Sequence, residues 1–179
     1  RLAEKLAAEL DFNLFDREVI QEIAKSAKIS DRLLNSLDEK GLNMVEEAIA
    51  ALVNERYLWP DQFIRHLMKV IGTIGRQGRA VVVGRGAHFV LSADACLRLR
   101  VIAPFEKRVA GLARRYQIGK EEARKQVLKT DADRRSFSRK YFYADISDPL
   151  HYDLVINTDQ LQMDAAVQAV KAAIERSAS

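Results

Sequence analysis

The stretch AVVVGRGAHFVL, from Ala80 to Leu91, decides the fold class of this chain of 179 residues. It opens with an apolar, valine-rich run without polar alternation, which is typical of a strand buried on both faces in a parallel sheet. Gly84-Arg85-Gly86 then interrupts the apolar pattern before a second apolar run begins. The stretch therefore predicts a buried parallel strand that ends in a tight turn.

Further strands and helices are predicted on both sides of this stretch. Three other strand patterns occupy residues 12–15, 97–102 and 153–158. Helical periodicity marks residues 1–10, 44–53, 63–74, 104–116, 120–142 and 163–174, and residues 16–75 are expected to be almost wholly helical. Residues 120–142 would form one long helix or a pair of helices. Strands that alternate with helices predict an α/β layer fold with right-handed crossovers between parallel strands.

The Gly84-Arg85-Gly86 turn does not complete a dinucleotide-binding fingerprint. That pattern is G-x-G-x-x-G, and Phe89 stands at its third glycine position. Arg85 would leave the carboxyl edge of the sheet, where such folds bind ligands, and its rigid guanidinium suits bidentate capture of a phosphate. Two structural roles stay open: a plain strand-to-loop turn, or an ion pair between Arg85 and a carboxylate.

A concentration of arginines follows later in the chain. Residues 98–141 hold fourteen basic and five acidic residues, although the net charge of the whole chain is only +4. Helical spacing brings most of one group to a single side of the expected helix: Asp131, Arg134, Arg135 and Arg139. Arginines on the preceding helix complete the set: Arg108, Arg114 and Arg115.

These two arginine-bearing helices, joined by a turn at Ile118-Gly119, could fold over a polyphosphate and neutralise its developing charge. Two alternatives stay open, namely a solvated helical face and an intrahelical salt bridge between Asp131 and Arg135. At the other end of the chain, Asp16 either caps the helix that follows it or binds a ligand. Arg17 beside it has the better claim to a ligand role.

Several classes of protein and site are not expected. Cys96 is the only cysteine, so no intramolecular disulfide can form, which fits a reducing compartment. His66, His88 and His151 lack the spacing of a zinc site, and no metal ligand is assigned. No apolar run approaches the roughly 20 residues of a membrane span. We therefore expect a soluble, cytoplasmic protein.

Taken in order, these segments resemble the cytidylate kinase family, nucleoside monophosphate kinases of the P-loop class, and especially its cytidylate kinase-like branch. The similar segments are RLAEKLAAELDFNLFDREVI, VVVGRGAHFVL, LRVIAPFEKRVAGLARRY, KTDADRRSFSRKYF and YDLVINTDQLQMDAAVQAV. The resemblance implies a three-layer α/β/α P-loop kinase-like fold with a parallel sheet, a helical monophosphate-binding insert and an arginine-rich helical lid. The single domain would comprise a core (1–30, 76–105 and 150–179), an insert (31–75) and a lid with flanking helices (106–145).

The resemblance also implies an activity: transfer of the γ-phosphoryl group of ATP, with Mg²⁺, to CMP or a similar monophosphate. Residues implied to bind the acceptor nucleotide are Asp16, Arg17, Gly84, Arg85 and Asp131. Residues implied to stabilise the transferring phosphoryl group are Arg114, Arg134, Arg135 and Arg139. Residues implied to lie near the donor nucleotide are Arg115, Asn157 and Thr158.

One departure from the family pattern concerns the glycine-rich P-loop, which in that family immediately precedes the helix that residues 1–10 resemble. We expect this loop, which cradles the donor phosphates and helps to hold magnesium, upstream of residue 1, and activity depends on it. Two other functions stay open: a nucleotide-binding regulatory domain that has lost the chemistry, and a nucleic-acid-binding module. Asp131 and Asp133 interrupt the basic cluster and disfavour the latter, so small nucleotides are the expected partners.

Overall fold

The computed structural model describes residues 2–16, 19–20 and 62–177. Arg17 and most of the helical insert expected over residues 31–75 lie outside the described residues. The chain divides into two compact units, Arg1–Cys96 and Leu97–Ser179, each of which is described by itself.

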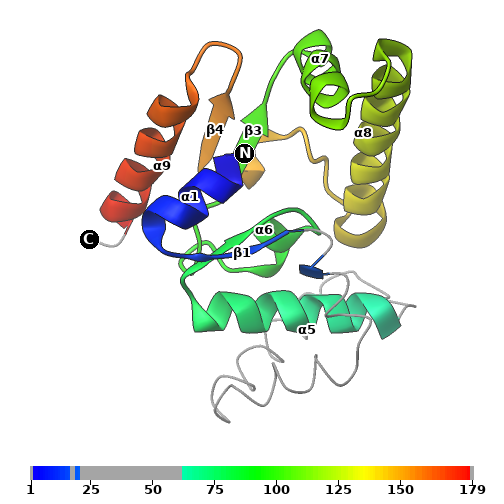
Figure 1. Cartoon of the computed structure of the whole chain (residues 1–179). Coiled ribbons are helices and arrows are strands. Elements are labelled where there is room, and N and C mark those ends of the chain that lie inside the picture. Colours follow the sequence, from blue (N-terminus) through cyan, green and yellow to red (C-terminus); the bar gives the residue numbers. More distant parts are fainter. Residues whose placement is uncertain (1, 17–18, 21–61, 178–179) are drawn as a thin grey trace. The chain divides into compact units, whose positions relative to one another are not determined.

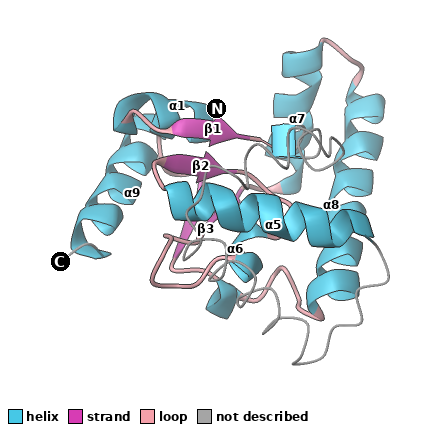
Figure 2. Ribbon diagram, turned by 90° about the horizontal axis from the view of Figure 1, so that it is seen from below, coloured by secondary structure: helices cyan, strands magenta, loops and turns pink. Residues whose placement is uncertain are grey.

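A short parallel sheet organises the first unit. Its elements are α1 (Leu2–Leu10), β1 (Asn13–Phe15), α5 (Gln62–Gln77), β2 (Ala80–Val82) and α6 (Ala87–Val90). β1 and β2 run parallel, with Asn13 opposite Ala80 and Phe15 opposite Val82. Figure 2 shows these two strands side by side, and in Figure 1 α1 lies above the pair and α5 below it.

The core of the first unit is built mainly on α5. Its apolar residues recur at helical spacing, and at most 1% of each is exposed: Ile64, Leu67, Met68, Val70, Ile71 and Ile74. Thr73 is also fully buried, and its hydroxyl donates a hydrogen bond to the carbonyl oxygen of Lys69 (2.8 Å), so the buried polar group is satisfied. Leu2 and Leu6 of α1 are buried at a spacing of one turn.

The strand β2 differs from its prediction in burial. Ala80, Val81 and Val82 are half-buried, and Val83 is 38% exposed. The expectation of a strand buried on both faces is therefore wrong for this structure. Side-chain burial depends on what packs against the two faces of a strand, and the described elements leave these side chains partly exposed.

The amino ends of β1 and β2 are joined by an exposed ion pair. Arg79 donates from Nη2 to the Asp11 carboxylate (2.5 Å) and to the Asp11 carbonyl oxygen (3.0 Å). Both residues have left-handed backbones, with φ of 47° at Arg79 and 54° at Asp11, and Gly78 before Arg79 has φ of 70°. The pair fastens the end of the sheet opposite to the turn after β2.

The second unit contains a further parallel pair of strands and a helical hairpin. Its elements are β3 (Leu99–Ile102), α7 (Phe105–Tyr116), α8 (Lys120–Phe142), the short 3₁₀ helix η1 (Pro149–His151), β4 (Leu154–Asn157) and α9 (Met163–Ser177). β3 and β4 run parallel from Leu99 opposite Leu154 to Ile102 opposite Asn157. Figure 1 shows α9 alongside β4. The predicted elements of this unit are confirmed, with slightly shorter strands.

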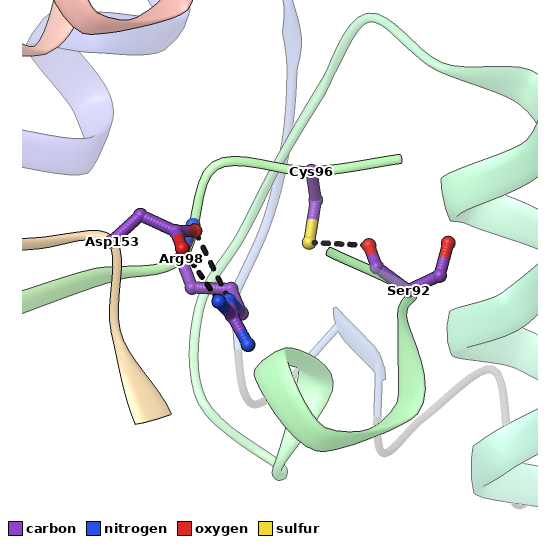
Figure 3. Close-up of polar contacts among 4 residues, drawn as sticks. All are labelled: Ser92, Cys96, Arg98 and Asp153. Carbon is purple, nitrogen blue, oxygen red and sulfur yellow. Dashed lines mark hydrogen bonds and ion pairs between the residues drawn. The ribbon is translucent and has the colours of Figure 1, made fainter. Parts of the chain in front are cut away.

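An arginine–aspartate pair closes the amino ends of β3 and β4. The backbone N–H and Nε of Arg98 donate to Asp153 Oδ2 (2.7 and 3.0 Å), and Nη2 donates to Oδ1 (2.5 Å), as Figure 3 shows. These hydrogen bonds lower the pKa of the Asp153 carboxyl. In the same figure the Sγ atom of Cys96 contacts the carbonyl oxygen of Ser92 at 3.6 Å.

The hairpin of α7 and α8 has a small apolar core of its own. Its buried residues are Val109, Ala123 and Val127, covered by Phe105, Leu112, Ala113 and Ile118. The chain turns where the sequence predicts, since Gln117 ends α7 with φ of 53° and Gly119 precedes α8. Beside the core, Glu106 pairs with Lys120 (3.3 Å) and with Arg124. The hairpin is therefore held by side-chain contacts as well as by its turn.

The two units share the predicted design of parallel strands alternating with helices, so the α/β fold class is confirmed. The short helix α6 and the helix η1 were not predicted. The Asp148-Pro149 pair contained a signal for η1, because Asp148 caps it by accepting a hydrogen bond from the backbone N–H of Leu150 (2.9 Å). Among the helices that the structure describes, none is long and apolar enough to cross a membrane.

Candidate nucleotide site

Two predicted site segments meet at the carboxyl edge of the first sheet. The backbone N–H of Val83 donates to the carbonyl oxygen of Phe15 (2.8 Å), which continues the pairing of β1 and β2 by one step. Asp16 and Gly84 therefore leave neighbouring parallel strands at the same edge. Ligands of open α/β sheets bind at this edge.

The turn after β2 consists of three successive left-handed residues. The φ angles are 82° at Gly84, 53° at Arg85 and 72° at Gly86. The predicted role of the two glycines, to free the chain to turn, is confirmed, because glycine adopts positive φ without steric cost. The amide of Ala87 then donates to the carbonyl oxygen of Gly84 (3.2 Å), and α6 begins.

Arg85 itself is an unusual residue for that conformation. A residue with a Cβ atom is strained at positive φ, and strain of this kind gathers at functional sites. The side chain is half-buried, and its Nε atom is buried. Four other residues with a Cβ atom also have positive φ, namely Asp11, Arg79, Gln117 and Tyr143, so a ligand role for Arg85 stays a prediction.

Asp16 caps the helical turn that follows β1. Its Oδ1 accepts a hydrogen bond from the amide of Val19 (2.9 Å), and its carbonyl oxygen accepts one from Ile20 (3.1 Å). The capping role that the sequence suggested is thus confirmed. A ligand role for Asp16 and for Arg17 stays a prediction.

The second group of predicted residues lies on α8. Because α8 is one continuous helix, residues 131, 134, 135 and 139 fall on one side of it. Arg134, Arg135 and Arg139 are exposed, and within the described parts of the chain none of them forms an ion pair or a hydrogen bond. Three guanidinium groups thus lie open on one helix face.

Asp131 has a different partner from the one that the spacing suggested. Arg108 of α7 donates from Nη1 to Asp131 Oδ1 (2.8 Å), across the hairpin. The side chains of Arg108 and Asp131 are 35% and 22% exposed, and the hydrogen bond from Arg108 is the main cause of a lowered Asp131 pKa. The Asp131–Arg135 bridge is therefore wrong: the half-buried interhelical partner holds the carboxylate instead.

The arginines near the end of α7 are exposed. Arg115 lies seven residues after Arg108, so the two residues share a face of α7, whereas Arg114 lies on another face. The guanidinium of Arg115 lies 5.7 Å from the centroid of the Tyr116 ring. Arg108, which the sequence grouped with Arg114 and Arg115, pairs with Asp131 of α8.

Asn157 ends β4 and Thr158 follows it, and their side chains support the loop. Thr158 donates from its amide and its hydroxyl to the carbonyl oxygen of Ile102 (2.9 and 3.2 Å). Asn157 Oδ1 accepts from the amide of Asp159 (3.0 Å), and the Asp159 carboxylate pairs with Lys107 of α7 (3.2 Å). A role of these residues at the donor nucleotide stays a prediction.

The side chains of the turn after β2 and of the α8 face suit a phosphate better than a bare metal ion. Arginine matches phosphate oxygens in charge and in hydrogen-bond geometry. Among the described residues, no group of three or more His, Cys, Asp or Glu side chains lies so that it could hold a metal ion. No metal ligand can therefore be named among them.

Comparison with known proteins agrees with this chemistry. The family model of the cytidylate kinase-like family matches residues 1–160. A cytidylate kinase from Ignicoccus hospitalis is 25% identical over 171 residues, which cover 95% of this chain and 88% of that protein. Cytidylate kinases from Methanocaldococcus jannaschii and Thermococcus sibiricus are 29% and 36% identical over 105 and 95 residues. These two alignments cover 57% and 53% of this chain, and 59% and 49% of the relatives.

One solved structure has a similar fold. It is that of an uncharacterized protein from Eubacterium ventriosum, with a TM-score of 0.73 and 20% sequence identity. The match covers 98% of this chain and 90% of the other. At that identity the likeness shows the fold alone.

Proposed function

Because the chain belongs to the cytidylate kinase-like family, we propose that it transfers the γ-phosphoryl group of ATP to CMP or a similar nucleoside monophosphate. The observation that carries the proposal is the open arginine face of α8, formed by Arg134, Arg135 and Arg139. These arginines are exposed and form no close ion pair within the described residues, so their guanidinium groups are available to phosphate oxygens. CMP is the first acceptor to test because the matched relatives are named cytidylate kinases.

The acceptor monophosphate would bind at the carboxyl edge of β1 and β2. Arg85 would hold its phosphate, assisted by Arg17, and Asp16 would accept a hydrogen bond from the nucleotide. The family resemblance implies a contact of Asp131 with the acceptor nucleotide as well. The attacking atom is a phosphate oxygen that is already ionised at neutral pH. The reaction therefore needs positioning and charge neutralisation more than a general base.

During transfer, a bond forms between the γ-phosphorus and an acceptor phosphate oxygen, and the bond from that phosphorus to the β,γ-bridging oxygen breaks. ADP leaves with the electron pair of the broken bond. Arg114, Arg134, Arg135 and Arg139 would neutralise the charge that spreads over the transferring oxygens. Closure of the hairpin would exclude water and so limit hydrolysis of ATP.

The donor nucleotide would lie near Arg115, Asn157 and Thr158. Magnesium, when bound, would neutralise charge on the donor phosphates. Its protein ligands and the cradle of the donor phosphates are expected in a loop upstream of residue 1, so we assign none of them to a described residue. The alternative function is a nucleotide-binding regulatory domain that has kept the fold and lost the chemistry.

The test measures ADP release by the full-length protein with ATP, Mg²⁺ and each of CMP, dCMP, UMP and AMP. We expect turnover with at least one acceptor and a fall of about 100-fold or more in kcat when Arg135 is replaced by Gln. Lys129→Gln is the matched control, because Lys129 is also an exposed cation of α8 but lies on the opposite side from Asp131.

Two results would decide against transferase activity. Saturable binding of ATP or CMP without any ADP release would support the regulatory domain. Absence of both binding and turnover would contradict a nucleotide function altogether. Equal losses in Arg135→Gln and Lys129→Gln would remove the specific role of the α8 face.

A further inference from the structure

We propose that Arg108 is a positioning residue that holds Oδ1 of the Asp131 carboxylate across the hairpin and leaves its Oδ2 atom open to the acceptor nucleotide. This inference rests on the proposed function and gives a specific role to Arg108, which the sequence groups only in general terms with the arginines of the two helices. It starts from a conflict within α8. Asp131 lies three and four residues before Arg134 and Arg135, the spacings at which a carboxylate pairs with an arginine in the same helix.

In the structure, Asp131 pairs with an arginine of α7 and not with one of its own helix. Arg108 donates from Nη1 to Asp131 Oδ1 at 2.8 Å. Within the described residues, Oδ1 is the only oxygen of this carboxylate that accepts a hydrogen bond, so Oδ2 has capacity for a hydroxyl or amino group of a ligand. The side chain of Asp131 is 22% exposed, so a ligand in solution can reach it.

The position of Arg108 is set by its own surroundings. Its guanidinium lies 5.8 Å from the centroid of the Phe105 ring, and Phe105 packs against the apolar core of the hairpin. The arginine is therefore anchored in α7, and its hydrogen bond fixes the carboxylate on α8. Without Arg108, Asp131 would turn to Arg134 or Arg135 and occupy a guanidinium that the phosphate needs.

Arg124 offers a matched control for this role. It also links α7 and α8, through an ion pair with Glu106, and its guanidinium also lies near the Phe105 ring (5.1 Å). Arg124 does not pair with Asp131. A variant at either arginine removes one interhelical ion pair, but only the variant at Arg108 releases Asp131.

The experiment compares Arg108→Gln, Arg108→Lys and Arg124→Gln in the full-length protein. We expect Arg108→Gln to weaken CMP binding about tenfold, the loss of one charge-assisted hydrogen bond, with Arg108→Lys restoring part of it. Arg124→Gln should leave CMP binding unchanged although it loosens the hairpin to a similar degree. Equal losses in the two Gln variants would overturn the proposal, since a structural role alone would then explain them.

A second readout does not depend on any activity. Carbon NMR of the Asp131 carboxyl, assigned with Asp131→Asn, reports its pKa. We expect the chemical shift and the titration of this carboxyl to change in Arg108→Gln, because its hydrogen-bond partner changes, and to stay as in the wild type in Arg124→Gln; an unchanged signal in Arg108→Gln would overturn the proposal. If the wild-type protein binds no nucleotide while the NMR result is as expected, the proposed function fails and the control of Asp131 by Arg108 stands.

Discussion

Two substitutions at Arg85 separate the strain of its left-handed backbone from the role of its guanidinium in binding. Replacement by Ala removes the guanidinium and keeps a Cβ atom at φ of 53°, whereas replacement by Gly removes both. The two variants lose the same side-chain contacts. The difference in their free energies of unfolding therefore measures the strain of a left-handed residue with a Cβ atom.

The expected difference is about 1 kcal/mol in favour of Arg85→Gly. The left-handed conformation costs an L-residue roughly 1–2 kcal/mol, and the greater freedom of glycine in the unfolded chain offsets part of that gain. In a protein of this size the difference corresponds to about 2–4 °C in Tm. Urea unfolding and thermal melts of the two variants, measured side by side, provide the assay.

The affinities of the two Arg85 variants for CMP should not follow their stabilities. Both Arg85 variants lose the guanidinium, so both should bind CMP roughly 10- to 100-fold more weakly than the wild type while binding ATP normally. Isothermal titration calorimetry measures both affinities. The more stable variant, Arg85→Gly, would thus be no better a binder than Arg85→Ala.

Arg79 is the matched control, since it is also an arginine at positive φ after a left-handed glycine. Arg79→Gly should exceed Arg79→Ala in stability by a similar margin, and neither should alter CMP binding. Equal stabilities of Arg85→Ala and Arg85→Gly would refute the strain argument. Unchanged CMP affinity in both would refute the ligand role of Arg85.

Three further predictions concern stability and pH. Asp16→Asn should keep the helix cap, whereas Asp16→Ala should cost about 1 kcal/mol in urea unfolding; weaker CMP binding in the stable Asn variant would show a separate role for the charge. A Cβ atom on Gly75 would lie 2.4 Å from Leu91 Cδ2, whereas one on Gly111 meets nothing within 4 Å. Gly111→Ala should therefore raise the free energy of unfolding by about 1 kcal/mol. Gly75→Ala should raise it only when Leu91 is also replaced by Ala, and the double-mutant cycle should give a coupling energy of about 1–2 kcal/mol. Additive effects of the two substitutions would exclude the steric clash. The lowered pKa of Asp153 means that its ion pair stabilises the protein above the ordinary carboxyl pKa and that this stability is lost as the pH falls through the lowered value. The Tm of Asp153→Asn should accordingly fall less than that of the wild type between pH 6 and pH 3, and parallel pH profiles would contradict this assignment.

Local features of the chain were readable from the sequence. The valine-rich run before Gly84 predicts β2, and the break at Gly119 predicts the turn between α7 and α8, because period and turn chemistry are properties of neighbouring residues. The two glycines around Arg85 likewise indicate a turn with positive φ angles. The burial of β2 was misjudged, since it depends on which elements pack against the two faces of the strand.

The partner of Asp131 shows most clearly where local reasoning ends. Sequence spacing places Arg135 within reach on the same helix, and it cannot rank that residue against an arginine 23 positions away. The choice depends on how α7 crosses α8 and on how far the two side chains are buried, and both follow from packing around Val109 and Val127. The sequence by itself determined the elements, the turns and the residues that carry the charges. Only the tertiary structure decided which carboxylate each arginine meets, because that energy comes from contacts between residues that are distant along the chain.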